Sequence, residues 1–169
     1  SSRQFPEGDV QHWWHPPHGA GVRTRITDDL LWLPYVLAEY LEVTGDWSVC
    51  GEKTCYLESP PLREGERERY ETPRCSERED TVYRHALRCA MERGAGSHGL
   101  ALIGGGDWND GMNRVGAGGR GESVWLTWFL ALVLRKFAPV CRHMEEPQLA
   151  EELLGRAEGY RKAAEAAWD

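Results

Sequence analysis

A long glycine-rich stretch, residues 94–121, divides this chain and limits what it can fold into. It shows neither the spacing of an amphipathic helix nor the alternation of a strand, and it separates two segments with helical periodicity. Loops of this length inside a compact domain are usually functional. We therefore expect helices that support a functional loop.

Four runs with helical spacing predict four helices. Thr27 and Asp28 resemble an N-cap for the first, and Gly45 is expected to end it. Pro139 is expected to stop the third helix, and Pro147 to begin the fourth. The predicted helices cover approximately residues 28–44, 79–93, 122–138 and 147–167.

The remaining segments carry no strand-like alternation of any length. Residues 1–27 are interpreted as an extended loop or short strand turns, and residues 46–78, rich in proline, glycine and charge, as a surface loop. The sequence therefore predicts an all-α fold.

Composition excludes some functions. Lys+Arg 20 against Asp+Glu 27 gives a net charge of −7, which argues against a nucleic-acid partner. The longest apolar run, residues 124–133, is about half of the roughly 20 residues of a membrane span. Five cysteines without a CxxC pair favour reduced thiols and a cytoplasmic location; a local Cys50–Cys55 bridge is the alternative.

The segment Asp107-Trp108-Asn109-Asp110 places two carboxylates, a carboxamide and an indole together, with glycines on both sides. The indole can cover the apolar face of a sugar while the acids accept from its hydroxyls. A carboxyl group in such a cleft can donate a proton to a glycosidic oxygen, provided that burial or the nearby Asp107 makes it hold that proton near neutral pH. The segment indicates an enzyme acting on a glycan; the alternative is a structural turn.

The tail of this stretch, residues 114–122, has glycines but no GK[ST] sequence and no preceding strand, which makes a nucleotide loop improbable. Glu122 and Ser123 are instead expected to cap the next helix.

His12, His15 and His18 are three residues apart, which raises the question of a metal site. Three imidazoles at this spacing share a face only on a helix, and Pro16-Pro17 breaks one. No HExxH motif is present. We expect no metal here; polar rings lining a sugar cleft or ordinary packing are the alternatives.

Two arginines and two aspartates, Arg23, Arg25, Asp28 and Asp29, lie just before the first predicted helix. Aspartates can accept from sugar hydroxyls, and arginines can donate to sugar oxygens or to phosphate. The alternative is a surface ion pair with a helix cap. All four are candidate substrate-binding residues.

Three motifs, in this order, resemble the inverting glycoside phosphorylases related to cellobiose phosphorylase, glycoside hydrolase family 94. They are DVQHWWHPP at 9–17, RTRITDDLLWL at 23–33 and GGGDWNDGMNRVGAGGRGESVW at 104–125. The sequence of the third motif is most similar to the branch of the family that contains the phosphorylase-like domain of cyclic β-1,2-glucan synthases and the β-1,2-oligoglucan phosphorylases.

This resemblance implies a site and a reaction. It implies that Asp110 is the general acid and that Trp108 lines the sugar subsite on the non-reducing side of the bond. Arg23, with Asp28 or Asp29, would contact the sugar. The reaction is phosphorolysis of a β-glucan, β-1,2-linked rather than β-1,4-linked, to α-glucose 1-phosphate. Inorganic phosphate is the co-substrate and no cofactor is expected. A non-catalytic domain that binds glycan or controls chain length is the alternative.

The resemblance also implies an architecture, namely part of an (α/α)6 barrel. Residues 1–169 would form a fragment of one catalytic domain, without the N-terminal β-sandwich and the rest of the barrel. The family's phosphate pocket, a His and a Thr-Gly pair, has no matching segment after residue 140. We therefore expect the isolated chain to be inactive. For the full-length protein, a homodimer and attachment to the inner membrane are the two alternatives.

Overall fold

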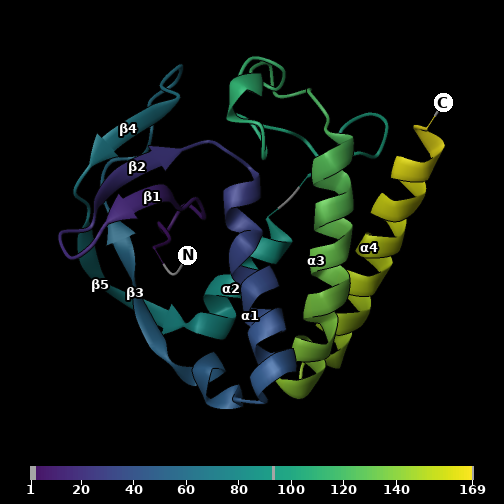
Figure 1. The fold of residues 1–169 in the computed structure, drawn as a ribbon, viewed down its shortest axis with the longest axis horizontal. Helices are drawn as coiled ribbons and strands as arrows, with labels where there is room; N and C mark the ends of the chain where they lie inside the picture. Colours follow the sequence, from purple (N-terminus) through teal and green to yellow (C-terminus); the bar gives the residue numbers. More distant parts are fainter. Residues whose placement is uncertain (1–2, 93, 169) are drawn as a thin grey trace.

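The computed structural model describes residues 3–92 and 94–168. Over these residues the strands gather on one side of α1, and the long helices α3 and α4 lie on its other side (Figure 1). The α-helices are α1 (Trp32–Thr44), α2 (Val82–Met91), α3 (Val124–His143) and α4 (Pro147–Ala166). The strands are β1 (Gln11–His15), β2 (Ala20–Thr24), β3 (Lys53–Glu58), β4 (Glu68–Glu71) and β5 (Arg74–Thr81). Short 3₁₀ helices include η1 (Asp28–Leu30) and η3 (Asp110–Met112).

The prediction of an all-α fold is wrong, because the chain forms two antiparallel sheets. One has the strand order β1-β2-β4, and the other pairs β3 with β5. Residues 46–78, interpreted as a surface loop, contain β3, β4 and the first part of β5. Strands β4 and β5 are rich in Glu and Arg and are mostly exposed or half-buried, so they lack the apolar alternation by which strands are recognised.

The helix ends follow the sequence signals in most places. Gly45 ends α1 in the left-handed conformation with φ 67°, and Pro147 opens α4. The Ser123 hydroxyl caps α3 by accepting from the backbone N–H of Leu126 at 3.0 Å, as expected.

Three helix ends differ clearly from the prediction. The second helix begins at Val82 rather than at 79, because residues 79–81 belong to β5. The first helix starts at Trp32, because Thr27 donates its hydroxyl to the carbonyl of Ile103 at 2.7 Å and so does not cap a helix. The third continues through Pro139 to His143. A proline there removes one backbone hydrogen bond, and packing of the surrounding apolar face outweighs that loss.

The core lies between the helices. Leu126, Leu130, Leu134 and Phe137 of α3 are fully buried in one cluster with residues of α1, α2 and α4. By length and composition alone α3 could cross a membrane, with a mean hydropathy of 1.5, but 56% of that window is buried within the protein. Such burial is typical of a core helix of a globular domain.

The cysteines depart from the expectation of reduced thiols. A disulfide joins Cys55 on β3 to Cys75 on β5, so the proposed Cys50–Cys55 pairing is also wrong. Cys50 is a free thiol buried in the helical core. The pairing of β3 with β5 brings the two half-cystines together, and that pairing is what the sequence did not reveal.

Candidate active site

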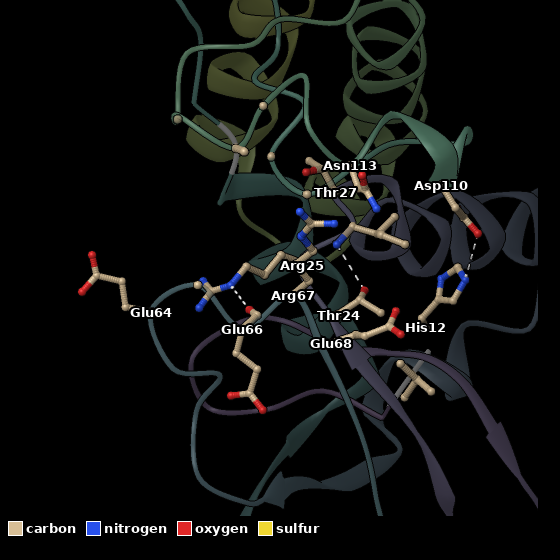
Figure 2. A pocket seen from close by; sticks show the side chains of 18 of the residues that line it. His12, Thr24, Arg25, Thr27, Glu64, Glu66, Arg67, Glu68, Asp110 and Asn113 are labelled. Carbon is tan, nitrogen blue, oxygen red and sulfur yellow. Dashed lines mark hydrogen bonds and ion pairs between the residues drawn. The ribbon is translucent and has the colours of Figure 1, made fainter.

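A cavity of about 980 Å³ lies between the end of β2, the segment 64–68 and the glycine-rich stretch (Figure 2). Its walls come from parts of the chain that are far apart in the sequence. The first wall consists of His12, Trp13, Val22, Thr24, Arg25, Ile26 and Thr27. The second consists of Glu64, Gly65, Glu66, Arg67 and Glu68, and the third of Gly104, Gly105, Asp110, Asn113, Gly116, Ala117 and Gly119.

Backbone contacts hold the first and third walls together. The N–H of Gly105 donates to the carbonyl of Arg25 at 2.9 Å, and the N–H of Thr27 donates to the carbonyl of Gly106 at 2.9 Å. A Cβ atom at Gly105 would lie 2.8 Å from the Arg25 backbone, which is closer than real Cβ contacts. A glycine is therefore needed where the two motifs meet.

Asp107 orients the segment that carries Asp110. Its buried carboxylate accepts from the Ser123 hydroxyl at 2.6 Å and from the backbone N–H of Asn109 at 3.0 Å. The same hydroxyl caps α3, so Asp107 ties the loop to a helix end. The Asn109 side chain in turn accepts from the N–H of Gly111 and caps η3.

Asp110 is the first residue of η3, and its carboxyl group faces the cavity. The side chain is 61% exposed, and its Oδ2 lies 3.5 Å from Nε2 of His12 (Figure 2). The carboxyl is therefore not buried, contrary to one of the two environments expected for it. The ionisable group beside it is His12.

His12 also contacts an aspartate behind it. Its Nδ1 lies 2.8 Å and 3.1 Å from the two carboxylate oxygens of Asp29. Partial burial lowers the pKa of His12, but the hydrogen bond to Asp29 and the charges of Asp29, Asp110 and Asp28 outweigh it and raise the pKa overall. The sequence indicated His12 as a residue of a sugar cleft, of ordinary packing or of a metal site, and gave no sign of its contact with the predicted acid.

Asp28 and Asp29 are both held by the protein. Asp29 accepts from the Thr24 hydroxyl at 3.1 Å, and burial raises its pKa. Asp28 accepts from the Trp32 indole at 3.1 Å, and its Oδ1 has no hydrogen-bond partner among the described residues. Burial, with the charge of Asp29, raises the pKa of Asp28 to about 6. The described lining of the cavity includes Thr24 but neither aspartate.

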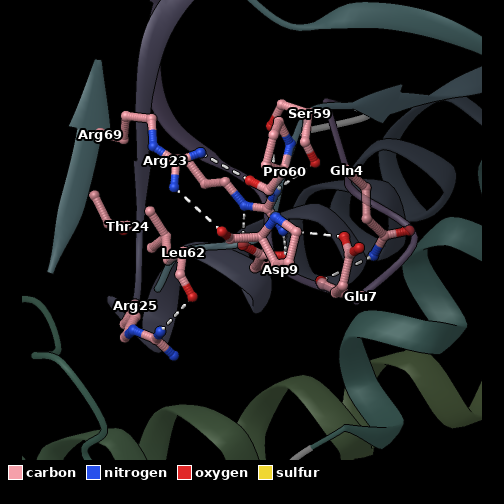
Figure 3. A network of polar contacts seen from close by, with 12 residues as sticks. Gln4, Glu7, Asp9, Arg23, Thr24, Arg25, Ser59, Pro60, Leu62 and Arg69 are labelled. Carbon is pink, nitrogen blue, oxygen red and sulfur yellow. Dashed lines mark hydrogen bonds and ion pairs between the residues drawn. The ribbon is translucent and has the colours of Figure 1, made fainter. Parts of the chain in front are cut away.

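Arg23 lies in a buried polar network outside the cavity lining (Figure 3). Its guanidinium is 1% exposed and donates to the Asp9 carboxylate at 2.6 and 2.8 Å and to Glu7 at 3.0 Å. The third nitrogen donates to the Ser59 hydroxyl at 3.2 Å and to the carbonyl of Pro60 at 3.3 Å. These contacts occupy the guanidinium within the protein and join β2 to the segment after β3.

Arg25 lines the cavity, and its guanidinium shapes the second wall. It donates to the carbonyls of Leu62 and Arg63 at 3.0 Å and of Glu66 at 3.1 Å. The residue therefore fixes the loop that faces Asp110 across the cavity.

Trp108 is 70% exposed and lies beyond the described cavity lining. Its ring centroid is 6.5 Å from that of Trp125 at the start of α3. Trp125 lies 5.4 Å from Phe129, which lies 4.8 Å from Trp32 of α1. Half-exposed rings thus continue from the loop across two helices, and such a surface can stack on sugar rings.

His12 and His15 have different partners. His12 contacts two aspartates, whereas His15 packs edge-on against Trp13 with centroids 5.2 Å apart. Over residues 3–92 and 94–168 no group of three or more His, Cys, Asp or Glu side chains is arranged to hold a metal ion.

Comparison with known proteins gives a family and several relatives. The family model described as glycosyl hydrolase 94 superfamily, catalytic domain, matches residues 1–169. Cyclic beta-(1,2)-glucan synthase NdvB of Rhizobium meliloti is 49% identical over 154 residues, which are 89% of this chain and 5% of that protein. Solabiose phosphorylase of Paenibacillus borealis is 31% identical over 172 residues, 98% of this chain and 19% of the relative.

Cellobionic acid phosphorylase of Neurospora crassa is 36% identical over 147 residues, 85% of this chain and 16% of that enzyme. The chain thus spans about a fifth or less of the length of these relatives.

Proposed function

Because this chain belongs to the glycosyl hydrolase 94 superfamily, matching its catalytic-domain model throughout, we propose that it forms part of an inverting glycoside phosphorylase domain. The substrate would be a β-glucan, with inorganic phosphate as co-substrate and α-glucose 1-phosphate as product. Two of the relatives are phosphorylases by name, which supports this reaction type.

Asp110 would be the general acid. The observation that carries this assignment is its exposed carboxyl on a cavity shared with Thr24–Thr27, which lie near the start of the second motif. In the reaction the carboxyl gives its proton to the glycosidic oxygen as the C–O bond breaks. A phosphate oxygen attacks the anomeric carbon from the opposite face, which inverts its configuration. Since phosphate is already anionic, a second carboxylate is not required as base.

The sugar contacts would come from the residues around the cavity. The exposed ring of Trp108 offers an apolar face for stacking. Neither Asp28 nor Asp29 lines the cavity; Asp29, whose oxygens contact the lining residues His12 and Thr24, would act by holding these two side chains in place. Arg23 would support the site from behind, because its donors already have partners.

The linkage proposed is β-1,2. Its support is the 49% identity to a protein named as a cyclic β-1,2-glucan synthase, which exceeds the identities to the two phosphorylases. The same relative favours a second candidate function, a domain that binds glycan or controls chain length without phosphorolysis, because its name describes synthesis.

The test is a glucose 1-phosphate release assay on the full-length protein with β-1,2- and β-1,4-linked gluco-oligosaccharides. We expect phosphate-dependent release from the β-1,2 substrate. Asp110→Asn should lose it by about 100- to 10,000-fold, the range for removal of a general acid, while glycan binding survives. Glu152→Gln, an exposed carboxylate on α4, is the control.

Binding without phosphate-dependent release would favour the non-catalytic candidate. Loss of binding together with release in Asp110→Asn would make Asp110 structural. The isolated chain, assayed in parallel, is expected to be inactive, and clear turnover by it would refute that expectation.

A further inference from the structure

Strand β1 is irregular at His12. Its pairing with β2 aligns Gln11 with Arg23 and Trp13 with Val22, so β1 has one residue more than its partner at this point. In a regular strand, neighbouring side chains point to opposite faces. Here His12 and Trp13 both line the cavity. A β-bulge re-aims a side chain in this way, and bulges are over-represented next to active sites.

The imidazole of His12 connects strand β1 to two other elements of the structure. Nδ1 of His12 contacts the Asp29 carboxylate of η1 at 2.8 Å, and Nε2 lies 3.5 Å from Oδ2 of Asp110 in η3. Asp29 is 10% exposed and is held in turn by the Thr24 hydroxyl at the end of β2. Asp29 therefore holds the imidazole ring in place, and Nε2 of this ring lies beside the Asp110 carboxyl.

This arrangement fixes one of the two possible ring protons of His12. An ionised carboxylate only accepts, so Nδ1 of His12 carries a proton and donates it to Asp29. Nε2 then faces Asp110 in one of two states that hold the same number of protons. The proton lies either on Asp110, with His12 neutral, or on Nε2 of His12, which then forms an ion pair with the Asp110 carboxylate.

We propose that His12 is a positioning residue for the general acid, which orients the Asp110 carboxyl and shares one proton with it. The proposal rests on phosphorolysis as the proposed function. As the glycosidic C–O bond breaks, Asp110 gives its proton to the leaving oxygen, and the carboxylate left behind lies beside His12. The pair takes up one proton from solvent before the next cycle.

The charged and titratable groups that face His12 are Asp29 and Asp28 from η1 and Asp110 from η3. Partial burial lowers the pKa of His12, but the hydrogen bond to Asp29 and the charges of these three carboxylates keep it above its usual value. His12 therefore holds its proton to higher pH than an isolated imidazole, and this proton lies beside the Asp110 carboxyl.

The kinetic test uses His12→Asn in the full-length enzyme. Asparagine can keep a donor toward Asp29 but ends short of Asp110. We expect kcat to fall by about 10- to 100-fold, less than the loss for the acid itself, with KM nearly unchanged. The alkaline limb of the kcat profile should move to lower pH. A raised KM with unchanged kcat would reduce His12 to a sugar contact and overturn the proposal.

The control is His98→Asn. His98 also pairs with a carboxylate, Glu122, but its ring is 77% exposed and lies away from the cavity lining. Its kcat and pH profile should match the wild type.

A second measurement does not depend on turnover. In the full-length protein labelled with 15N-histidine, NMR titration should show a lower pKa for His12 in Asp110→Asn and in Asp29→Asn. If the pKa of His12 is the same in Asp110→Asn as in the wild type, the proposal is refuted even if the enzyme is a phosphorylase. A wild type that lacks phosphorolysis but shows the coupling would instead sink the proposed function and, with it, the catalytic meaning of the pair.

Discussion

Replacement of Asp28 by asparagine tests whether this buried carboxyl costs stability when it is ionised. Asp28 is 5% exposed, and one of its oxygens lacks a hydrogen-bond partner among the described residues. Burial, and then the charges of Asp29 and Asp107, raise its pKa from 3.8 to about 6, against the opposing hydrogen bond from Trp32. An asparagine keeps the shape and never ionises.

The magnitude and sign follow from linkage. A pKa that is higher in the folded state means that folding binds a proton between about pH 4 and 6. The stability contributed by the neutral carboxyl is therefore present below about pH 4 and is lost as the pH rises through 6. At about 1.4 kcal/mol per pH unit, the full loss is about 3 kcal/mol, of which about 2 kcal/mol falls between pH 4 and 7.

The assay is urea unfolding of wild type and Asp28→Asn at pH 4, 5, 6 and 7. An amide nitrogen without a partner adds a cost of about 1–3 kcal/mol, but this cost is the same at every pH. The informative quantity is thus the change in the difference between variant and wild type. It should favour the variant by about 2 kcal/mol more at pH 7 than at pH 4.

A matched control is Glu152→Gln, because Glu152 is exposed on α4 and has no burial to relieve. Its difference from wild type should stay flat across the series. If the Asp28→Asn difference is equally flat, the carboxyl is solvated in solution and the reasoning about its burial is refuted.

Two further predictions concern binding and stability. Trp108→Ala should weaken binding of a β-glucan oligosaccharide by about 10-fold, or about 1.4 kcal/mol, in titration calorimetry, without changing the unfolding free energy; unchanged affinity would contradict stacking on the exposed ring. Arg23→Met should lower the unfolding free energy by about 3–5 kcal/mol in urea, because it leaves Asp9 with a carboxylate that has lost its buried partner. A loss below about 1 kcal/mol would mean that the ion pair is not formed in solution.

The helices could be predicted from the sequence because their signals are local. Gly45, Ser123 and Pro147 act on the residues next to them, and each marks a helix end in the structure. The family was also predicted correctly from three motifs. The strands could not be predicted, since β4 and β5 are stabilised by their partners and carry charged residues on exposed faces. No local pattern reports such pairing.

The candidate site was predictable in its residue types but not in its contacts. Asp110 was assigned from its motif, whereas its neighbour His12 comes from another motif almost a hundred residues earlier. Arg23 and Arg25 look equivalent in sequence, yet one is buried against Asp9 and the other lines the cavity. The alternation of β2 does not determine this difference; the position of each partner in three dimensions does.

The glycines of the long loop allow motifs that are distant in the sequence to lie close together. A Cβ atom at Gly116 would lie 2.2 Å from the carbonyl oxygen of Gly104, so this part of the loop packs against its own beginning. Gly104 itself bridges to Ile26, which anchors that beginning to the residues after β2. The distance between Asp110 and His12 therefore depends on close backbone approaches that only glycine permits. A larger side chain at Gly104 or Gly116 would shift the Asp110 carboxyl without contacting it.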